Sequence, residues 1–127
     1  MKNPSPAAKK DFEGAFAGLR RILAKHAKHL SVVKDGPRGY YLESSTPRYK
    51  GKPLMFGAAV IGKNYVSYHL MPVYMNPAAL KSMSPELRKR MQGKACFNFV
   101  APDKKLFAEL DELTQRGFEG FRKLGYL

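Results

Sequence analysis

The sequence predicts a single α+β domain in which a mainly antiparallel sheet of about five strands packs against an N-terminal and a C-terminal helix. Three observations predict it: helical periodicity at both ends of the chain, short runs rich in valine, tyrosine and phenylalanine between them, and turn sequences that separate the runs. The 127 residues are 44% hydrophobic, which is enough for one buried core. We expect residues 1–7 to form a flexible tail and residues 8–127 to form the domain.

The first predicted helix covers residues 8–30. Its apolar residues recur at intervals of three, four and seven, which places them on one face: Phe12, Phe16, Leu19, Leu23 and Leu30. The same segment also carries six cations: Lys9, Lys10, Arg20, Arg21, Lys25 and Lys28. His26 falls on the apolar stripe three residues before His29, so we interpret it as a partly buried, hydrogen-bonded histidine rather than a metal ligand.

Five short runs are expected to form the strands. They cover residues 31–34, 40–43, 54–61, 65–71 and 95–100. The turn sequences at residues 35–39 and 62–64 are short enough for hairpins, which favours an antiparallel meander. The run 54–61 is apolar on both faces and is therefore predicted to be central, with Gly57 marking either a bulge or a close backbone approach.

Proline placement predicts two short helices between the fourth and fifth strands. Asn76-Pro77 and Ser84-Pro85 each put a capping residue before a proline, and the second helix should run from residue 85 to 92 and end at Gly93. A last amphipathic helix follows Asp103 and should be closed by Gly125.

The single cysteine, Cys96, excludes an internal disulfide framework and suits a reducing compartment, so we expect a cytoplasmic protein. The longest apolar stretch, residues 54–61, is far shorter than a membrane-spanning helix, and the first six residues lack the apolar core of a secretory signal. We therefore expect no membrane partner.

The formal net charge is +13, and the excess is placed upstream of the last helix: residues 1–100 hold 18 Lys and Arg against 5 Asp and Glu, and residues 101–127 hold 5 against 5. Such a surface attracts polyanions such as nucleic acid without specifying a base sequence. The candidate polyanion-binding residues are Arg20, Arg21, Lys25, Lys28, Arg88, Lys89 and Arg90.

Three segments each combine a Gly-Lys turn with strand residues: residues 49–56 (Tyr-Lys-Gly-Lys-Pro-Leu-Met-Phe), 60–67 (Val-Ile-Gly-Lys-Asn-Tyr-Val-Ser) and 93–99 (Gly-Lys-Ala-Cys-Phe-Asn-Phe). They resemble the YdhG-like family, also called domain of unknown function 1801 and described as frataxin-like. The resemblance extends from about residue 10 to the C-terminus. It implies a curved sheet packed against the first and last helices, and it brings no catalytic residues with it.

The family's frataxin-like description implies an iron carrier as an alternative function. Frataxins present an acidic ridge along their first helix, whereas this first helix offers Asp11 and Glu13 among six Lys and Arg. Because iron prefers oxygen ligands, we assign no metal-binding residues and no cofactor.

Strand alternation groups the remaining polar residues. If Val66, Tyr68, Leu70, Phe97 and Phe99 face the helices, a polar set consisting of Ser67, His69, Cys96 and Asn98 shares the opposite face. A cysteine beside a histidine can become a thiolate nucleophile, so a Cys/His enzyme is a further alternative, although no cysteine-enzyme signature surrounds Cys96.

The sequence thus predicts a non-enzymatic binding or interaction domain, with a small or anionic ligand or a protein partner on the sheet face; a nonspecific polyanion binder is the next alternative. Residues on or beside that face are the candidate ligand-binding set: Arg38, Tyr49, Lys52, Tyr65, His69, Tyr74, Cys96 and Asn98.

Overall fold

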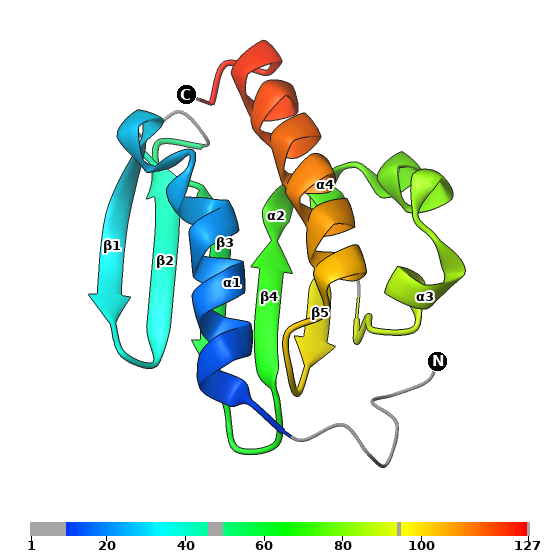
Figure 1. The fold of residues 1–127 in the computed structure, drawn as a ribbon. Helices are drawn as coiled ribbons and strands as arrows, with labels where there is room; N and C mark the ends of the chain where they lie inside the picture. Colours follow the sequence, from blue (N-terminus) through cyan, green and yellow to red (C-terminus); the bar gives the residue numbers. More distant parts are fainter. Residues whose placement is uncertain (1–9, 46–49, 94, 127) are drawn as a thin grey trace.

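A computed structural model describes residues 10–45, 50–93 and 95–126 (Figure 1). The predicted tail, residues 1–7, and the candidate site residue Tyr49 lie outside the described residues. The helices are α1 (Phe12–Ala24), α2 (Met71–Met75), α3 (Pro85–Arg88) and α4 (Lys104–Lys123), with 3₁₀ turns η1 (Ala27–His29) and η2 (Pro77–Ser82). The strands are β1 (Leu30–Gly36), β2 (Gly39–Ser44), β3 (Met55–Ile61), β4 (Val66–Leu70) and β5 (Cys96–Phe99).

The strands form one antiparallel sheet whose spatial order, β1-β2-β3-β4-β5, follows the chain. Short turns join β1 to β2 and β3 to β4, as the turn sequences predicted, a longer segment connects β2 to β3, and β3 is the central strand. The segment that holds α2, η2 and α3 separates β4 from β5. The predicted α+β class and the predicted strand number are confirmed.

Helices α1 and α4 lie side by side over the same face of the sheet (Figure 1). We call this the inner face. Its alternating residues on the last two strands are buried: Val66, Tyr68, Leu70, Phe97 and Phe99. Aromatic contacts tie α4 to the sheet, with ring centroids 5.3 Å apart for Phe56 and Phe121 and 5.0 Å apart for Phe99 and Phe107. The predicted facial sorting of these strands is therefore correct.

A β-bulge lies in the first half of β3. The register passes from Leu42 opposite Gly57 to Glu43 opposite Met55, so Phe56 is an extra residue on the β3 side. Phe56 is fully buried against Phe121 on the inner face. A Cβ atom on Gly57 would lie 2.8 Å from Leu23 Cδ2. Both alternatives left open for Gly57, a bulge and a close approach, are found here.

Helix α1 is shorter than predicted. Asp11 Oδ1 accepts a hydrogen bond from Gly14 N (2.9 Å) and caps the helix, which ends at Ala24 rather than at residue 30. The chain then turns through η1, because Leu30 is already paired with Ser44 in the sheet. Strand pairing therefore prevails over the helical periodicity of residues 25–30.

The segment between β4 and β5 also differs from prediction. The fourth strand ends at Leu70, and Met71 begins α2, in which Pro72 occupies the first turn where its missing N–H is not needed. Helix α3 is capped by the Ser84 hydroxyl as expected but ends at Arg88, not at residue 92. Residues 90–92 instead pair with the edge of β5.

The caps of α4 match the sequence prediction. Asp103 Oδ1 accepts from Leu106 N (3.0 Å) at the start of the helix. At the end, Gly125 has φ +81°, and Tyr126 N donates to Phe121 O (3.0 Å), the pattern of a Schellman motif. The cap places the Tyr126 ring 5.4 Å from the Phe121 ring.

Candidate functional site

The polar residues selected by strand alternation lie on the side of the sheet away from α1 and α4, which we call the outer face. Among the described residues, no helix lies over this face (Figure 1). Strands β4 and β5 are neighbours, and their register sets Ser67 opposite Asn98 and His69 opposite Cys96. The adjacency that the sequence left open is thus present, and all four side chains are half-buried.

Hydrogen bonds join these side chains into one network. Ser67 Oγ donates to Asn98 Oδ1 (3.0 Å), and Asn98 Nδ2 donates to Gln92 Oε1 (2.7 Å). The hydroxyl of Tyr65 donates to the same Gln92 oxygen (2.9 Å). Cys96 Sγ lies 3.6 Å from Asn98 Oδ1 and 3.9 Å from His69 Nε2. Because Asn98 uses both ends of its amide, its orientation is fixed by its neighbours.

Gln92 is the functional candidate that sequence reasoning missed, because residues 85–92 were predicted to be one helix. Its backbone N donates to Cys96 O (2.9 Å), while Asn98 N donates to Arg90 O (2.8 Å). These bonds carry Gln92 to the edge of β5. The available signal was Gly93, whose φ of +79° suits a turn between two paired segments as well as a helix end.

The directions in which the pKa values of Cys96 and His69 are shifted argue against a thiolate nucleophile. Burial raises the pKa of the Cys96 thiol, and the nearby Ser67 hydroxyl offsets only part of that rise. Burial also lowers the pKa of His69, so the imidazole is neutral at pH 7 and provides no positive charge for a thiolate. The outer-face network is therefore an array of neutral donors and acceptors.

An open cleft of about 490 Å³ adjoins this network, and we call it the β5 cleft. Tyr65, Gln92 and Asn98 line one part of it, and Lys10, Lys89 and Arg90 bring three positive charges. The residues that line the cleft are Lys10, Tyr65, Lys89, Arg90, Met91, Gln92, Asn98 and Val100. Neutral hydrogen-bonding groups and cations thus meet at one concave surface.

Three other predicted ligand-binding residues lie outside the network. Arg38 is exposed in the β1–β2 turn, where its Nη2 donates to Ile61 O (3.4 Å). Lys52 is exposed in the segment before β3, and Tyr74 is 55% exposed on α2, which packs against α4. The structure therefore brings together four of the predicted residues, namely Tyr65, His69, Cys96 and Asn98.

The cations predicted to bind a polyanion fall into two groups. Arg20 on α1 forms a bidentate pair with Asp35 (3.0 Å) and stacks over the Tyr40 ring, and Lys25, directly after α1, pairs with Asp111. Arg21 and Lys28 are exposed on the same segment. In the second group, Lys89 and Arg90 line the β5 cleft beside exposed Arg88.

His26 is buried, as the apolar stripe predicted, with 5% of its surface exposed. Its ring stacks on Phe118, with centroids 4.7 Å apart. The expected hydrogen bond is not found at Nε2, which has no partner among the described residues. Burial lowers the pKa of His26, with Asp111 opposing the shift.

Within residues 10–45, 50–93 and 95–126, no three His, Cys, Asp or Glu side chains are close enough to hold a metal ion together. None of the helices in this part of the chain has the length and apolar character needed to cross a membrane. Comparisons with protein families, with curated proteins and with solved structures found no match.

Proposed function

We propose that this protein is a non-enzymatic binding domain that holds a small anionic ligand in the β5 cleft, beside the outer-face network. One observation carries the proposal: Tyr65, Gln92 and Asn98 present neutral hydrogen-bonding groups at the cleft where Lys10, Lys89 and Arg90 gather positive charge. Cations supply attraction to an anion, and fixed polar groups supply orientation.

The proposal includes that the protein is a YdhG-like domain, on the basis of the three segments that resemble that family. Two of them, residues 60–67 and 93–99, include parts of β3 and β4 and the whole of β5, and they contribute Tyr65 and Asn98 to the cleft. The thiol and the imidazole of the outer face act as neutral groups in this function.

Titration with inorganic pyrophosphate, followed by backbone amide NMR shifts, tests the proposal. We expect saturable shifts centred on Gln92 and Asn98. A Lys89→Gln/Arg90→Gln double variant should weaken binding by roughly tenfold or more, the loss of two charge-assisted contacts.

The matched control is Arg21→Gln/Lys28→Gln, which removes the same net charge from α1 and η1. This control should change the affinity by less than roughly twofold at 0.15 M salt, where distant charges are screened. Equal weakening by both double variants would mean that net charge alone attracts the anion, and the proposed site would be wrong.

A second candidate function is nonspecific polyanion binding at the same surface. The ion pairs of Arg20 and Lys25 favour the β5 cleft over the first helix as the polyanion contact. A polyanion that used Arg20 and Lys25 would have to break those pairs, which opposes binding there. Binding to mixed-sequence DNA should then lose roughly two units of salt dependence, on a log–log plot, in Lys89→Gln/Arg90→Gln. An unchanged slope in this variant would exclude this surface as the polyanion contact.

A further inference from the structure

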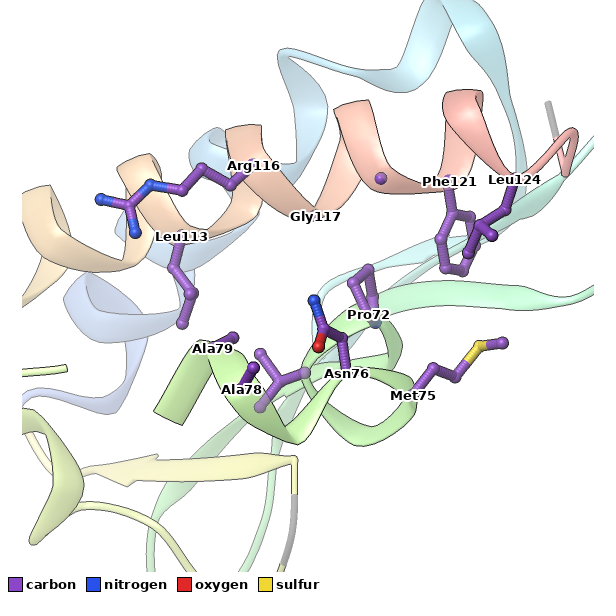
Figure 2. A pocket seen from close by; sticks show the side chains of 12 residues that line it. Pro72, Met75, Asn76, Ala78, Ala79, Leu113, Arg116, Gly117, Phe121 and Leu124 are labelled. Atoms are coloured by element: carbon purple, nitrogen blue, oxygen red, sulfur yellow. The ribbon is translucent and has the colours of Figure 1, made fainter. Parts of the chain in front are cut away.

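A second cavity lies between α4 and the segment that forms α2 and η2 (Figure 2). We call it the α2–α4 pocket; it has a volume of about 310 Å³, and it is separate from the β5 cleft. Most of its wall is apolar, including Val73, Leu113 and Phe121. Its size and apolar character are those of a small-molecule site at the lower end of the usual range.

Two glycines on α4 shape this pocket. A Cβ atom on Gly117 would lie 2.8 Å from Pro72 Cβ, so the helices touch there and close one wall. A Cβ atom on Gly120 would meet no atom within 4 Å, although Gly120 lines the pocket. The missing side chain at Gly120 therefore leaves part of the cavity open. Leu124, one turn further along, lines the pocket while 63% exposed.

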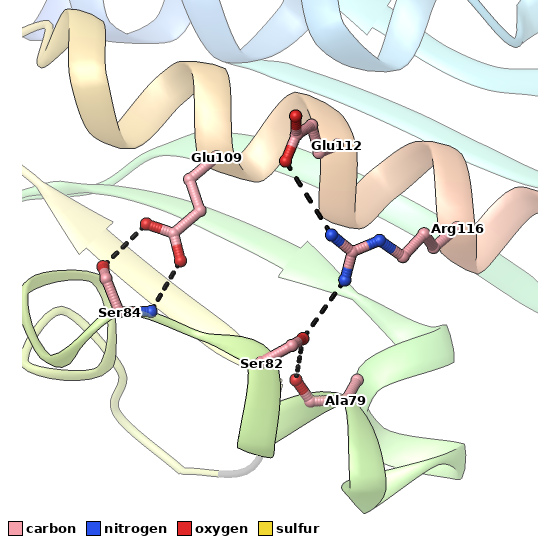
Figure 3. A network of polar contacts seen from close by, with 6 residues as sticks. All are labelled: Ala79, Ser82, Ser84, Glu109, Glu112 and Arg116. Atoms are coloured by element: carbon pink, nitrogen blue, oxygen red, sulfur yellow. Dashed lines mark hydrogen bonds and ion pairs between the residues drawn. The ribbon is translucent and has the colours of Figure 1, made fainter.

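Among the described residues that line the pocket, two side chains are polar, and neither is acidic. The Asn76 amide points from the end of α2 toward α4, across the middle of the pocket (Figure 2). Arg116 lies near Leu113 at one end, where its Nη1 donates to Ser82 Oγ (3.2 Å) and its Nη2 is 3.8 Å from Glu112 Oε1 (Figure 3).

The Ser82 contact positions the Arg116 guanidinium, because Ser82 Oγ itself donates to Ala79 O (3.0 Å) on η2 (Figure 3). Nearby, Glu109 accepts from both N and Oγ of Ser84 (2.7 Å each) and so ties the start of α3 to α4. The Arg116–Glu112 pair is long and exposed, with 61% and 74% of the side chains accessible, so it stabilises the protein little and leaves the guanidinium able to take another carboxylate.

We propose that the α2–α4 pocket binds a small aliphatic carboxylate, with its chain against Phe121 and Leu124 and its carboxylate at the Arg116 end. The apolar wall suits the hydrocarbon chain of the ligand, because that chain would remove exposed Leu124 and the pocket lining from water, which is favourable. Guanidinium and carboxylate pair through charge-assisted hydrogen bonds, which accounts for the head group. This site does not depend on the function proposed for the β5 cleft.

Calorimetric titration with octanoate, compared with 1-octanol of the same chain length, tests both parts of the proposal. The wild-type protein should bind octanoate roughly tenfold more tightly than 1-octanol. Arg116→Gln should bring the two affinities together by weakening octanoate alone. Gly120→Leu should abolish binding of both, and since leucine is a better helix former than glycine, we expect this variant to fold.

Arg122→Gln is the matched control, because Arg122 lies on the same helix with the same 61% side-chain exposure and does not line the pocket. It should leave both affinities unchanged. Absence of saturable octanoate binding, or binding that survives Gly120→Leu, would overturn the pocket. Equal affinity for octanoate and 1-octanol in the wild-type protein, or an equal effect of Arg122→Gln, would overturn the role of Arg116.

Discussion

The two faces of the sheet are made by the same strands and differ in what covers them. On β4, Tyr68 points to the inner face and is completely buried under α4, whereas Ser67 and His69 point to the outer face and are half-buried. On β5, Phe97 and Asn98 show the same contrast. Period-two alternation therefore builds a packed core and a polar surface from one stretch of sequence.

The inner face is specified by packing and the outer face by hydrogen bonds. Rings from α4 and the sheet interlock on the inner face, where the only described side-chain hydrogen bond between β4 and α4 joins Tyr68 to Thr114 (2.6 Å). On the outer face, Asn98 and Gln92 hold a network that water can reach. Substitutions on the two faces should differ accordingly in their effect on stability.

Phe97→Ala should have the largest effect. Removing a fully buried phenylalanine leaves a cavity beneath α4 and should lower the free energy of unfolding by about 3–5 kcal/mol. Asn98→Ala, one residue along the same strand, should lower it by about 1 kcal/mol because its hydrogen bonds are partly solvated. Urea denaturation of the two variants measures both values; similar losses would mean that the faces are not energetically distinct.

Tyr68→Phe should have the next largest effect. It leaves the buried Thr114 hydroxyl without its partner and should lower the free energy of unfolding by about 1–3 kcal/mol. The double variant Tyr68→Phe/Thr114→Val removes both polar groups and should be less destabilised than the sum of the two single variants. Additive losses in denaturant titrations would show that the two hydroxyls do not interact.

The two buried or half-buried histidines should give a smaller, pH-dependent effect. Burial lowers the pKa of His26 and His69 below 6.5, so the unfolded chain binds more protons than the folded chain. Their stabilising contribution is complete above pH 6.5 and is lost as the pH falls through the folded pKa values. His26→Leu should flatten the slope of stability against pH more than His69→Gln, because the His26 Nε2 has no partner among the described residues. The reverse order in melts between pH 5 and 8 would contradict this.

The smallest expected effect concerns the reactivity of Cys96. A half-buried thiol with a raised pKa should react with iodoacetamide more slowly than a free cysteine peptide at pH 7–8. Urea-unfolded protein provides the control and should react at the peptide rate. Faster reaction in the folded protein would support the Cys/His enzyme that the geometry disfavours.

Much of the fold follows from local sequence patterns. Alternation assigned Tyr68 and Phe97 to the core, and capping chemistry placed the ends of α4 at Asp103 and Gly125. The errors fall where tertiary pairing competes with local periodicity. Residues 25–30 continue a helical stripe, yet Leu30 pairs with Ser44, and the helix predicted at residues 85–92 stops early because residues 90–92 pair with β5.

The candidate site was predictable only in part for the same reason. Alternation placed His69, Cys96 and Asn98 on one face, but the adjacency of β4 and β5 comes from the sheet order and not from either strand alone. Gln92 joins the network through an edge pairing, and the local signal for it, Gly93, is equally typical of a helix end. The α2–α4 pocket depends on α2, which the sequence does not predict: its pattern assigns Met71 to the end of a strand and residues 72–75 to no helix.

The extra residue at Phe56 has a consequence for how the chain tolerates changes in length. Because side chains on a strand alternate in phase, one inserted residue lets Phe56 and Gly57 both turn toward the helices while Ala58 returns to the outer side opposite His69. Deleting Phe56 would remove the bulge and restore regular alternation, with Met55 still opposite Glu43 on the outer side. The strand would keep its pairing, but the aromatic anchor of the central strand would be lost.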